Sequence, residues 1–332
     1  MRKIKIAQIG TSQNSHGNMI WSSLKKQSDI FEIVGFAMPE NERDKFPNNM
    51  AGFEGYNELT VDEILNNPEI EAVAIETEEK YLTKYALMAA EKAKHIHMEK
   101  PGGTVLADFE KLIAIVKNNE TVFHTGYMYR YNPYITELMT EIKNGELGEI
   151  ISVEAQMNCV HSKELRDWLG DYKGGSTFFL GCHLIDLILQ IMGTPERIIP
   201  LNKSTGIDGI KSEDFGMAAL EYKSGVSFAK VNSNEMGGFA RRQLVVSGTK
   251  KTVELKPLEM FADGGLITVK TEYESADWGN KGETSTCAVY DRYDPMMRSF
   301  AEMVCGEKQN PYSYDYELEL YKTILKCCGV DL

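Results

Sequence analysis

Two short motifs carry residues whose types and spacing suit acid–base chemistry. The first is Glu99-Lys100-Pro101, which closes the strand-like run 94–98. A lysine at the carboxyl end of a strand in an open α/β sheet points into the crevice where such sheets bind ligands. The proline disfavours the helical region for Lys100 and keeps it extended. This placement predicts a lysine directed into a site, although an isolated Lys-Pro pair is more often part of a surface turn.

The second motif is Gly174-Gly-Ser-Thr-Phe-Phe-Leu-Gly-Cys-His183-Leu-Ile-Asp186. Paired glycines permit a tight turn, and His183 and Asp186 then lie one turn apart on a helix. A carboxylate at this spacing can fix the tautomer of a histidine or raise its basicity. The alternative is a solvated Asp186 beside a structurally satisfied His183, because structural ion pairs also perturb histidines.

The turn Gly10-Thr-Ser-Gln-Asn-Ser-His-Gly17 follows the first strand, where a dinucleotide fingerprint would lie. The fingerprint uses glycines for a tight turn, for backbone approach to a pyrophosphate and for helix–strand packing. Gly10 holds the first position, and Ser12 and Ser15 hold the other two, unless Gly17 substitutes after a longer turn. A plain β–α turn explains this pattern about as well.

The end of the second strand is equally irregular, because Met38-Pro-Glu40 stands where an aspartate would hold the ribose hydroxyls of NAD. Either Glu40 reaches these hydroxyls or Arg43 meets a 2′-phosphate, so NAD and NADP both remain open.

Strand and helix patterns alternate through the first 124 residues, which indicates βαβ units and a parallel sheet. Right-handed crossovers then predict a doubly wound Rossmann domain. The expected strands are 3–9, 31–38, 71–76, 95–98 and 122–125, and the expected helices are 18–27, 59–65, 81–93 and 107–118.

Beyond residue 124 the pattern changes to long runs with a period of two. We expect an α+β domain over 125–332 with a large open, mostly antiparallel sheet, and a final helix that can pack near the first domain, 1–124. The expected helices are 134–144, 177–192, 290–305 and 315–328, and the expected strands include 150–158, 217–222, 226–232, 243–248 and 251–255.

Composition excludes several classes of function. The formal net charge of −13 argues against nucleic acids and anionic membranes as partners. No apolar run is long enough to span a bilayer, and residues 1–9 do not resemble a signal peptide. Six cysteines without paired spacing suit neither a disulfide framework nor a zinc site and indicate a reducing cytoplasm. His95 and His97 alternate on one strand without a third ligand nearby, so we expect no metal.

The order of these motifs resembles the Gfo/Idh/MocA family, the relatives of glucose–fructose oxidoreductase and inositol dehydrogenase. The resemblance covers nearly the whole chain and is most specific over 70–193. It is carried by the Gly10 turn, Ile70-Glu-Ala-Val-Ala-Ile-Glu-Thr77, Met98-Glu-Lys-Pro-Gly102, Tyr129-Arg-Tyr-Asn-Pro133, Gly145-Glu-Leu-Gly148 and the run from Gly174 to Asp186.

The resemblance implies a Rossmann domain that holds NAD or NADP, a second domain that covers the nicotinamide, and a sugar, polyol or derivative between them. It assigns catalysis to Lys100 and His183. The implied cofactor residues are Gly10, Thr11, Ser12, Asn14, Ser15, Glu40, Thr77, Glu99 and Lys100; the implied substrate residues are Tyr127, Arg130, Trp168, Phe179, His183 and Asp186.

Three positions depart from the family pattern. Phe179 replaces an aspartate common in members that oxidise alcohols, Leu82 replaces a histidine, and Ala93 replaces a glycine. Phe179 either stacks against a sugar ring or fills the space of the missing carboxylate, and we favour packing.

The function expected from these observations is hydride transfer between NAD or NADP and a hydroxyl or carbonyl carbon of a small molecule. Two alternatives remain: a dinucleotide- or sugar-binding regulatory protein with weakened catalysis, and redox-assisted lyase or hydrolase chemistry with recycled NAD. An open sheet face is usually covered, so a homodimer or homotetramer is expected.

Overall fold

The computed structural model describes residues 1–332, and its contacts divide the chain into two compact units. The first contains Met1–Tyr127 and Tyr293–Leu318, and the second contains Met128–Arg292 and Glu319–Leu332. The sequence-based division at residue 124 differs in two respects: the first unit extends to Tyr127, and it also includes Tyr293–Leu318.

The first unit is built on a five-stranded sheet in the order β2-β1-β3-β4-β5, with every pair parallel. This confirms the predicted Rossmann-type sheet. From β1 the chain first adds β2 on one side and then crosses to add β3, β4 and β5 on the other. Open α/β sheets bind ligands at such a switch point, which here lies at the carboxyl ends of β1 and β3. The strands are β1 (Ile4–Ile9), β2 (Phe31–Ala37), β3 (Ala72–Ile75), β4 (His95–Met98) and β5 (Phe123–Thr125).

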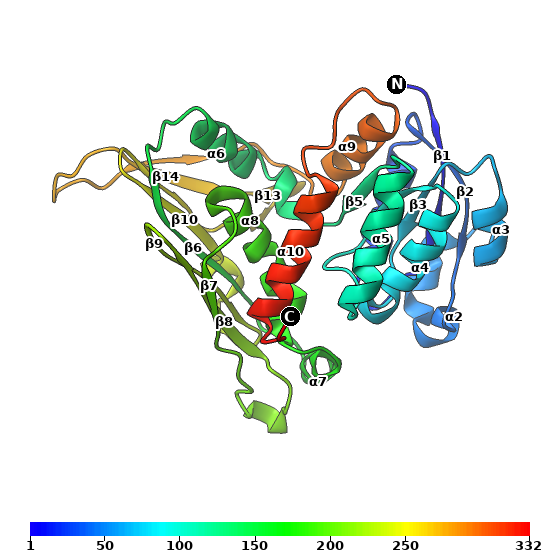
Figure 1. Cartoon of the computed structure of the whole chain (residues 1–332), viewed down its shortest axis with the longest axis horizontal. Helices are drawn as coiled ribbons and strands as arrows, with labels where there is room; N and C mark the ends of the chain where they lie inside the picture. The colour runs from blue at the N-terminus through cyan, green and yellow to red at the C-terminus, as the bar shows by residue number, and fades with distance from the viewer. The chain divides into compact units, whose positions relative to one another are not determined.

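Helices cover both faces of this sheet. Phe123 and His124 are successive residues of β5, so their side chains point to opposite faces. Phe123 meets Phe109 of α5, whereas His124 stacks on Phe300 of α9. Helices α4 and α5 pack side by side in front of the sheet (Figure 1), and α1 packs against α9. The helices are α1 (Gly17–Lys26), α2 (Glu42–Lys45), α3 (Val61–Asn66), α4 (Glu79–Glu91), α5 (Leu106–Asn118) and α9 (Asp294–Val304).

The second unit is built on an eight-stranded sheet in the order β15-β14-β11-β10-β6-β9-β8-β7. Only β6 and β9 run parallel, so the predicted large, mostly antiparallel sheet is confirmed. The strands are β6 (Ile150–Asn158), β7 (Arg197–Pro200), β8 (Phe215–Tyr222), β9 (Gly225–Asn232), β10 (Gln243–Gly248), β11 (Thr252–Leu255), β14 (Val269–Tyr273) and β15 (Glu283–Thr286); β12 (Met260–Ala262) and β13 (Gly265–Ile267) form a separate hairpin.

One face of the large sheet packs on helices. Val153 and Ala155 of β6 are buried with their β10 partners Val246 and Leu244, and α8 packs against β6 and β9. The opposite face carries the half-buried Glu154 and its neighbours, as expected for strands with alternating burial. The helices of this unit are α6 (Pro133–Lys143), α7 (Lys163–Trp168) and α8 (Cys182–Met192), and α10 (Tyr314–Cys327) continues from the first unit into the second.

Two predicted helices differ from the structure. The helix expected over 177–192 consists of a π-helix, Thr177–Gly181, followed by α8. The helix expected from residue 290 begins only at Asp294, because Tyr290 exchanges backbone hydrogen bonds with Leu266 and Pro295 suits the first turn.

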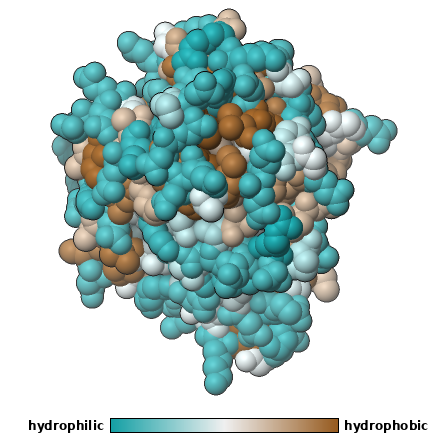
Figure 2. All heavy atoms as spheres, turned by 90° about the vertical axis from the view of Figure 1, so that its right-hand side faces the viewer, coloured by the Kyte–Doolittle hydropathy of each residue, from teal (hydrophilic) through white to brown (hydrophobic).

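The surface agrees with the acidic composition. Figure 2 shows a face that is mostly hydrophilic, with small separated hydrophobic patches. No helix combines the length and apolar character needed to cross a bilayer. All six cysteines are free thiols.

Candidate active site

Lys100 follows β4 directly and is buried, with 1% of its surface exposed. Its ammonium Nζ lies 3.5 Å from Oε1 of Glu99, and its backbone N–H donates to the same oxygen at 3.1 Å. The Lys100–Pro101 peptide bond is cis. A strand end thus holds a cation and a carboxylate together inside the first unit.

His16 is a site residue that the sequence did not single out. It is the residue that precedes the first turn of α1, and its Nδ1 lies 2.9 Å from Oε2 of Glu99. Its backbone N–H also donates to this oxygen, at 3.3 Å. The histidine in the first turn was visible, but nothing in the spacing indicated that residue 16 meets residue 99.

The turn after β1 fits a dinucleotide. Gly10 has a φ of +88°, and a Cβ there would lie 2.5 Å from Cγ2 and 2.7 Å from the backbone nitrogen of Thr77. Only glycine allows this close approach of the turn to the end of β3. Ser12 accepts the N–H of Ser15, and Ser15 accepts the N–H of Gly17, so the two serines order the turn in front of the positive N-terminus of α1. Asn14, predicted to bind the cofactor, lies half-exposed in this turn.

Two carboxylates follow β2, and they have different partners. Glu40 accepts hydrogen bonds from Lys84 at 2.5 Å and Tyr85 at 2.8 Å, and these bonds lower its pKa. Glu42 is fully buried and accepts the N–H of Thr11 at 2.8 Å, inside the dinucleotide turn. Burial raises the pKa of Glu42 to about 7. Glu42 was not predicted, because it lies four residues beyond the usual position of the ribose acid.

Two further buried acids, Glu76 and Glu79, lie after β3 on either side of Thr77. Burial, together with the charge of Glu99, raises the pKa of Glu76 well above its ordinary value. Burial raises the pKa of Glu79 to about 8, against the opposing attraction of Lys100. Both carboxyls are therefore favoured in the protonated form at neutral pH.

In the second unit, His183 lies near the start of α8 and is buried. Its ring meets Tyr129 edge-on, with centroids 5.5 Å apart. The Tyr129 hydroxyl donates to Glu259 at 3.0 Å, and Glu259 also accepts Arg292 at 2.6 Å. This network fixes the aromatic wall against His183. Tyr129 belongs to a quoted motif, but Glu259 lies 130 residues away and carried no sequence signal.

Asp186, the second member of the His-x-x-Asp pair, binds Arg130. The Arg130 Nε and Nη2 atoms donate to the two carboxylate oxygens at 2.9 and 2.7 Å, and Gln190 donates at 2.9 Å. Asp186 therefore links α8 to the segment Met128–Tyr131 through its ion pair with Arg130. It lies one helical turn after His183.

Phe179 lies in the π-helix, within an aromatic cluster. Its ring meets Trp168 edge-on at 5.4 Å and lies 6.2 Å from His161. Trp168 also contacts Tyr172 at 4.9 Å. π-Helical segments are rare and often mark functional sites, and this one leads directly into the helix that carries His183.

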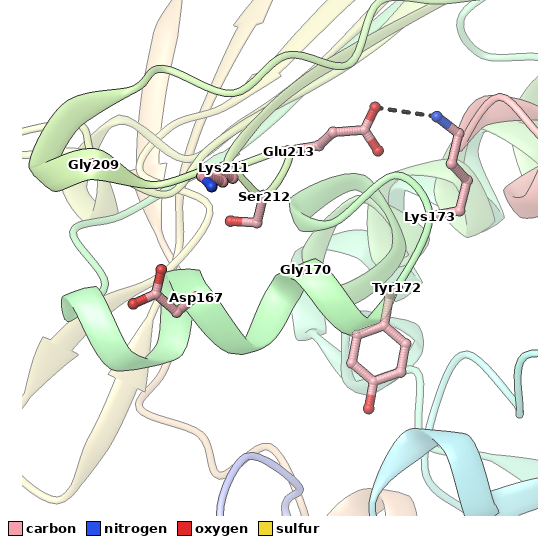
Figure 3. A pocket seen from close by; sticks show the side chains of 8 residues that line it. All are labelled: Asp167, Gly170, Tyr172, Lys173, Gly209, Lys211, Ser212 and Glu213. Atoms are coloured by element: carbon pink, nitrogen blue, oxygen red, sulfur yellow. Dashed lines mark hydrogen bonds and ion pairs between the residues drawn. The ribbon is translucent and has the colours of Figure 1, made fainter.

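A cavity of about 760 Å³ lies beside the segment that leads to this π-helix. In Figure 3, Asp167 projects from the helix and Ser212 from the loop on the other side, and the ion pair between Lys173 and Glu213 spans 3.3 Å. No residue predicted to bind substrate lines this cavity. Glu213 accepts the N–H of Gly174 at 2.7 Å and so holds the glycine turn before the π-helix.

Tyr127 closes the first unit as a buried residue whose N–H donates to the carbonyl of Thr125 at 2.8 Å. The structure thus brings Lys100 and Glu99 together in the first unit, and Arg130 and Asp186 in the second.

A parallel Rossmann sheet with a glycine turn, joined to a unit with a large mixed sheet, defines a dinucleotide-dependent oxidoreductase. Residues 4–127 match the family described as "Oxidoreductase family, NAD-binding Rossmann fold", and residues 135–254 match the Gfo/Idh/MocA C-terminal domain. The chain belongs to the Gfo/Idh/MocA family, and its cofactor is NAD or NADP.

Individual relatives cover most of the chain at low identity. An uncharacterized oxidoreductase of Rhizobium meliloti is 24% identical over 334 residues, which span 98% of this chain and 96% of the relative. The myo-inositol 2-dehydrogenase of Thermotoga maritima is 22% identical over 236 residues, 70% of this chain and 67% of the relative. The aldose–aldose oxidoreductase of Caulobacter crescentus, solved with glycerol, shares the fold with a TM-score of 0.79 at 18% identity, with both chains fully covered.

Proposed function

We propose that this oxidoreductase transfers a hydride between the nicotinamide of NAD or NADP and a hydroxyl or carbonyl carbon of a sugar, a polyol or a related small molecule. The observation that carries the proposal is the buried Lys100–Glu99 pair at the carboxyl end of β4. The substrate class is supported by relatives named for inositol and for aldoses.

Oxidation of a carbinol breaks a C–H bond and an O–H bond. The cofactor, when bound, accepts the hydride, and the protein must orient the carbinol and accept the hydroxyl proton. In the proposal, Lys100 and His183 are the catalytic residues: His183 is the general acid/base, and Lys100 polarises the substrate oxygen or shares its proton. The turn of Gly10, Thr11, Ser12, Asn14 and Ser15 binds the cofactor phosphates; Glu40 and Thr77 complete the cofactor site.

The proposed substrate residues are Tyr127, Arg130, Trp168, Phe179 and Asp186, together with His183. A guanidinium held by two bonds to Asp186 has a fixed orientation, which suits recognition of substrate oxygens. The aromatic rings of Trp168 and Phe179 suit contact with the apolar face of a sugar ring or packing behind it.

The proposal is tested by a panel of sugars and polyols with NAD⁺ and NADP⁺, followed through nicotinamide absorbance. Lys100→Met should lower turnover on the order of 10²–10⁴-fold, because it removes a group that transfers a proton. Lys92→Met, at an exposed position near the end of α4, is the control and should retain activity. Near-normal turnover of Lys100→Met contradicts its assignment.

A double variant, Lys100→Met with His183→Ala, shows whether the two residues serve one step. Groups that act as a unit give strongly non-additive losses, so the double variant should lose little more than the worse single variant. Fully additive losses contradict the joint role.

The two alternative functions are outcomes of the same experiments. Isothermal titration that detects binding of neither NAD nor NADP removes the enzyme function and favours a regulatory protein, in line with the altered turn and with Phe179. A cofactor that co-purifies and is unchanged after turnover favours redox-assisted lyase or hydrolase chemistry.

Assembly and location complete the proposal. The face of the large sheet opposite α8 carries half-buried side chains such as Phe228 and Met217. We expect this face to pair in a homodimer or homotetramer, which light scattering after size exclusion measures. The six free thiols suit the reducing cytoplasm.

A further inference from the structure

His16 and Glu99 connect Lys100 to a residue that solvent reaches. Glu99 and Lys100 are each 1% exposed, whereas the side chain of His16 is 22% exposed. The two oxygens of Glu99 divide their contacts: Oε1 lies 3.5 Å from Lys100 Nζ, and Oε2 lies 2.9 Å from His16 Nδ1. The three side chains therefore form a series of amine, carboxylate and imidazole that leads outward from the buried lysine.

A buried lysine that receives a proton needs a route by which to release it. Its ammonium group has little access to water, and proton transfer requires a partner within hydrogen-bond reach or one water away. The carboxylate of Glu99 next to the amine and the imidazole of His16 next to that carboxylate supply two further proton-carrying groups. The ring of His16 is held by Tyr293, with centroids 5.3 Å apart, and its backbone N–H also anchors Glu99, so the contact has a defined geometry.

A second polar branch leaves Glu99 but stays inside the first unit. Glu76 lies beside Glu99, His97 Nε2 lies 3.5 Å from Glu76 Oε1, and the Nδ1 atoms of His97 and His124 are 2.7 Å apart. These three residues are 0–1% exposed, and burial lowers the pKa of His97 to about 4, so this branch gives no outlet to solvent at neutral pH. Glu79 is the other acid that acts on Glu99, and burial keeps it protonated. Of these contacts of Glu99, the one with His16 leads to a side chain that solvent reaches.

We propose that Glu99 and His16 form the proton exit of the active site. The proposal rests on the hydride-transfer function above. On oxidation of a carbinol, the C–H electron pair goes to the nicotinamide, the C=O bond forms, and the hydroxyl proton goes to neutral Lys100. The ammonium of Lys100 passes a proton to the Glu99 carboxylate, which passes it to His16 and then to water. Lys100 ends neutral, and one proton leaves for each hydride transferred.

The first test separates hydride transfer from proton release in a single turnover. Stopped-flow absorbance follows the nicotinamide while a pH indicator follows the proton. His16→Gln keeps a polar side chain in the same turn but cannot relay a proton, and His95→Gln, on β4 away from Glu99, is the matched control. We expect His16→Gln to slow proton release on the order of tenfold to a hundredfold, with added imidazole restoring it. Proton release at the wild-type rate, or a loss that imidazole does not restore, overturns the relay.

The second test needs neither cofactor nor turnover. Nitrogen-detected NMR of the protein alone follows the protonation of the His16 ring in wild type, Glu99→Gln and Lys100→Met. The relay predicts that Glu99→Gln lowers the titration midpoint of His16 and that Lys100→Met raises it, because the three charges interact in series. A midpoint unchanged by both substitutions overturns the relay. If both substitutions shift the His16 midpoint as expected but the wild-type protein transfers no hydride, the result contradicts the proposed function and not the contacts among the three side chains.

Discussion

Arg130 and Asp186 form a two-point ion pair, with donor–acceptor distances of 2.9 and 2.7 Å, in which both side chains are 1% exposed. The two residues are 56 positions apart, and Asp186 lies one turn after His183. The pair therefore fixes the helix that carries the proposed catalytic histidine to the segment that carries Tyr129, whose ring contacts that histidine.

Removing one partner of this pair should destabilise the protein strongly. Asp186→Asn leaves the Arg130 guanidinium buried beside a neutral amide, which costs about 3–5 kcal/mol in free energy of unfolding. Urea denaturation followed by circular dichroism measures this loss. Asp167→Asn, in the exposed pair of Lys163 and Asp167, is the control and should change stability little. Equal effects of the two substitutions would show that the buried pair does not anchor α8.

The double change Arg130→Met with Asp186→Leu removes both charges. No charge of the pair then remains buried. The double variant should therefore lose less free energy of unfolding than the sum of the losses of Arg130→Met and Asp186→Leu. If the losses add, the pair is not coupled.

The fold was largely predictable, because its signals are local. The strands of the Rossmann sheet are short apolar runs between helices of ordinary length, and β4 matched the predicted 95–98 residue for residue. The two predicted helices that differ from the structure do so because of tertiary contacts or helix type, which the local pattern does not specify. Tyr290 has a helix-compatible sequence but pairs with Leu266, and the π-helical turn over Thr177–Gly181 has the same apolar pattern as an α-helix.

The site was predictable only where a motif brought its residues together. Lys100 with Glu99 came from one tripeptide, whereas His16 and Glu42 act through partners 83 and 31 positions away. The ion pair of Asp186 with Arg130 was also beyond the pattern, because the two residues are 56 positions apart. Side-chain contacts across strand ends depend on the sheet order, which periodicity alone does not specify.

Glu79 should make stability depend on pH. Its pKa is about 8 in the folded protein and near 4.5 when unfolded, so between these values the folded state holds a proton that the unfolded state has lost. The contribution of Glu79 to the free energy of unfolding therefore falls as the pH rises between the unfolded and the folded pKa, by up to roughly 5 kcal/mol. Above the folded pKa this contribution is constant. Glu79→Gln removes this dependence.

The measurement is urea unfolding at pH 5, 7 and 9. Glu79→Gln should gain stability relative to wild type as the pH rises, while Glu91→Gln, at the exposed end of the same helix, should not. A difference between Glu79→Gln and wild type that stays constant over this range contradicts a buried carboxyl that titrates near 8.

Glu42 should set the pH dependence of cofactor choice. Its carboxylate accepts the Thr11 N–H within the dinucleotide turn and gains its charge as the pH rises through about 7. A 2′-phosphate adds negative charge to the cofactor, so binding of NADP should weaken relative to NAD between pH 6 and 8, on the order of three- to tenfold.

Isothermal titration of both cofactors at pH 6 and 8 gives the ratio of their Kd values. In Glu42→Gln this ratio should change less with pH than it does in wild type. Glu40→Gln is the matched control: hydrogen bonds from Lys84 and Tyr85 lower the pKa of Glu40, so it stays ionised over this range and its removal should shift the ratio equally at both values. A ratio that changes with pH as much in Glu42→Gln as in wild type would assign the effect to another group.

Phe179 tests whether the missing family carboxylate was replaced by packing or by substrate contact. The ring lies against Trp168 and near His161 inside the second unit. Phe179→Leu keeps an apolar side chain and should cost about 1–2 kcal/mol of stability, whereas Phe179→Asp places a carboxylate among aromatic rings and should cost more than about 3 kcal/mol. Urea unfolding measures both. If the ring only packs, KM of the Leu variant stays within about threefold of wild type, since no substrate contact is lost. A KM that rises tenfold or more, with stability nearly unchanged, would show instead that Phe179 stacks on the substrate, because a lost contact in the bound complex leaves the unliganded fold intact.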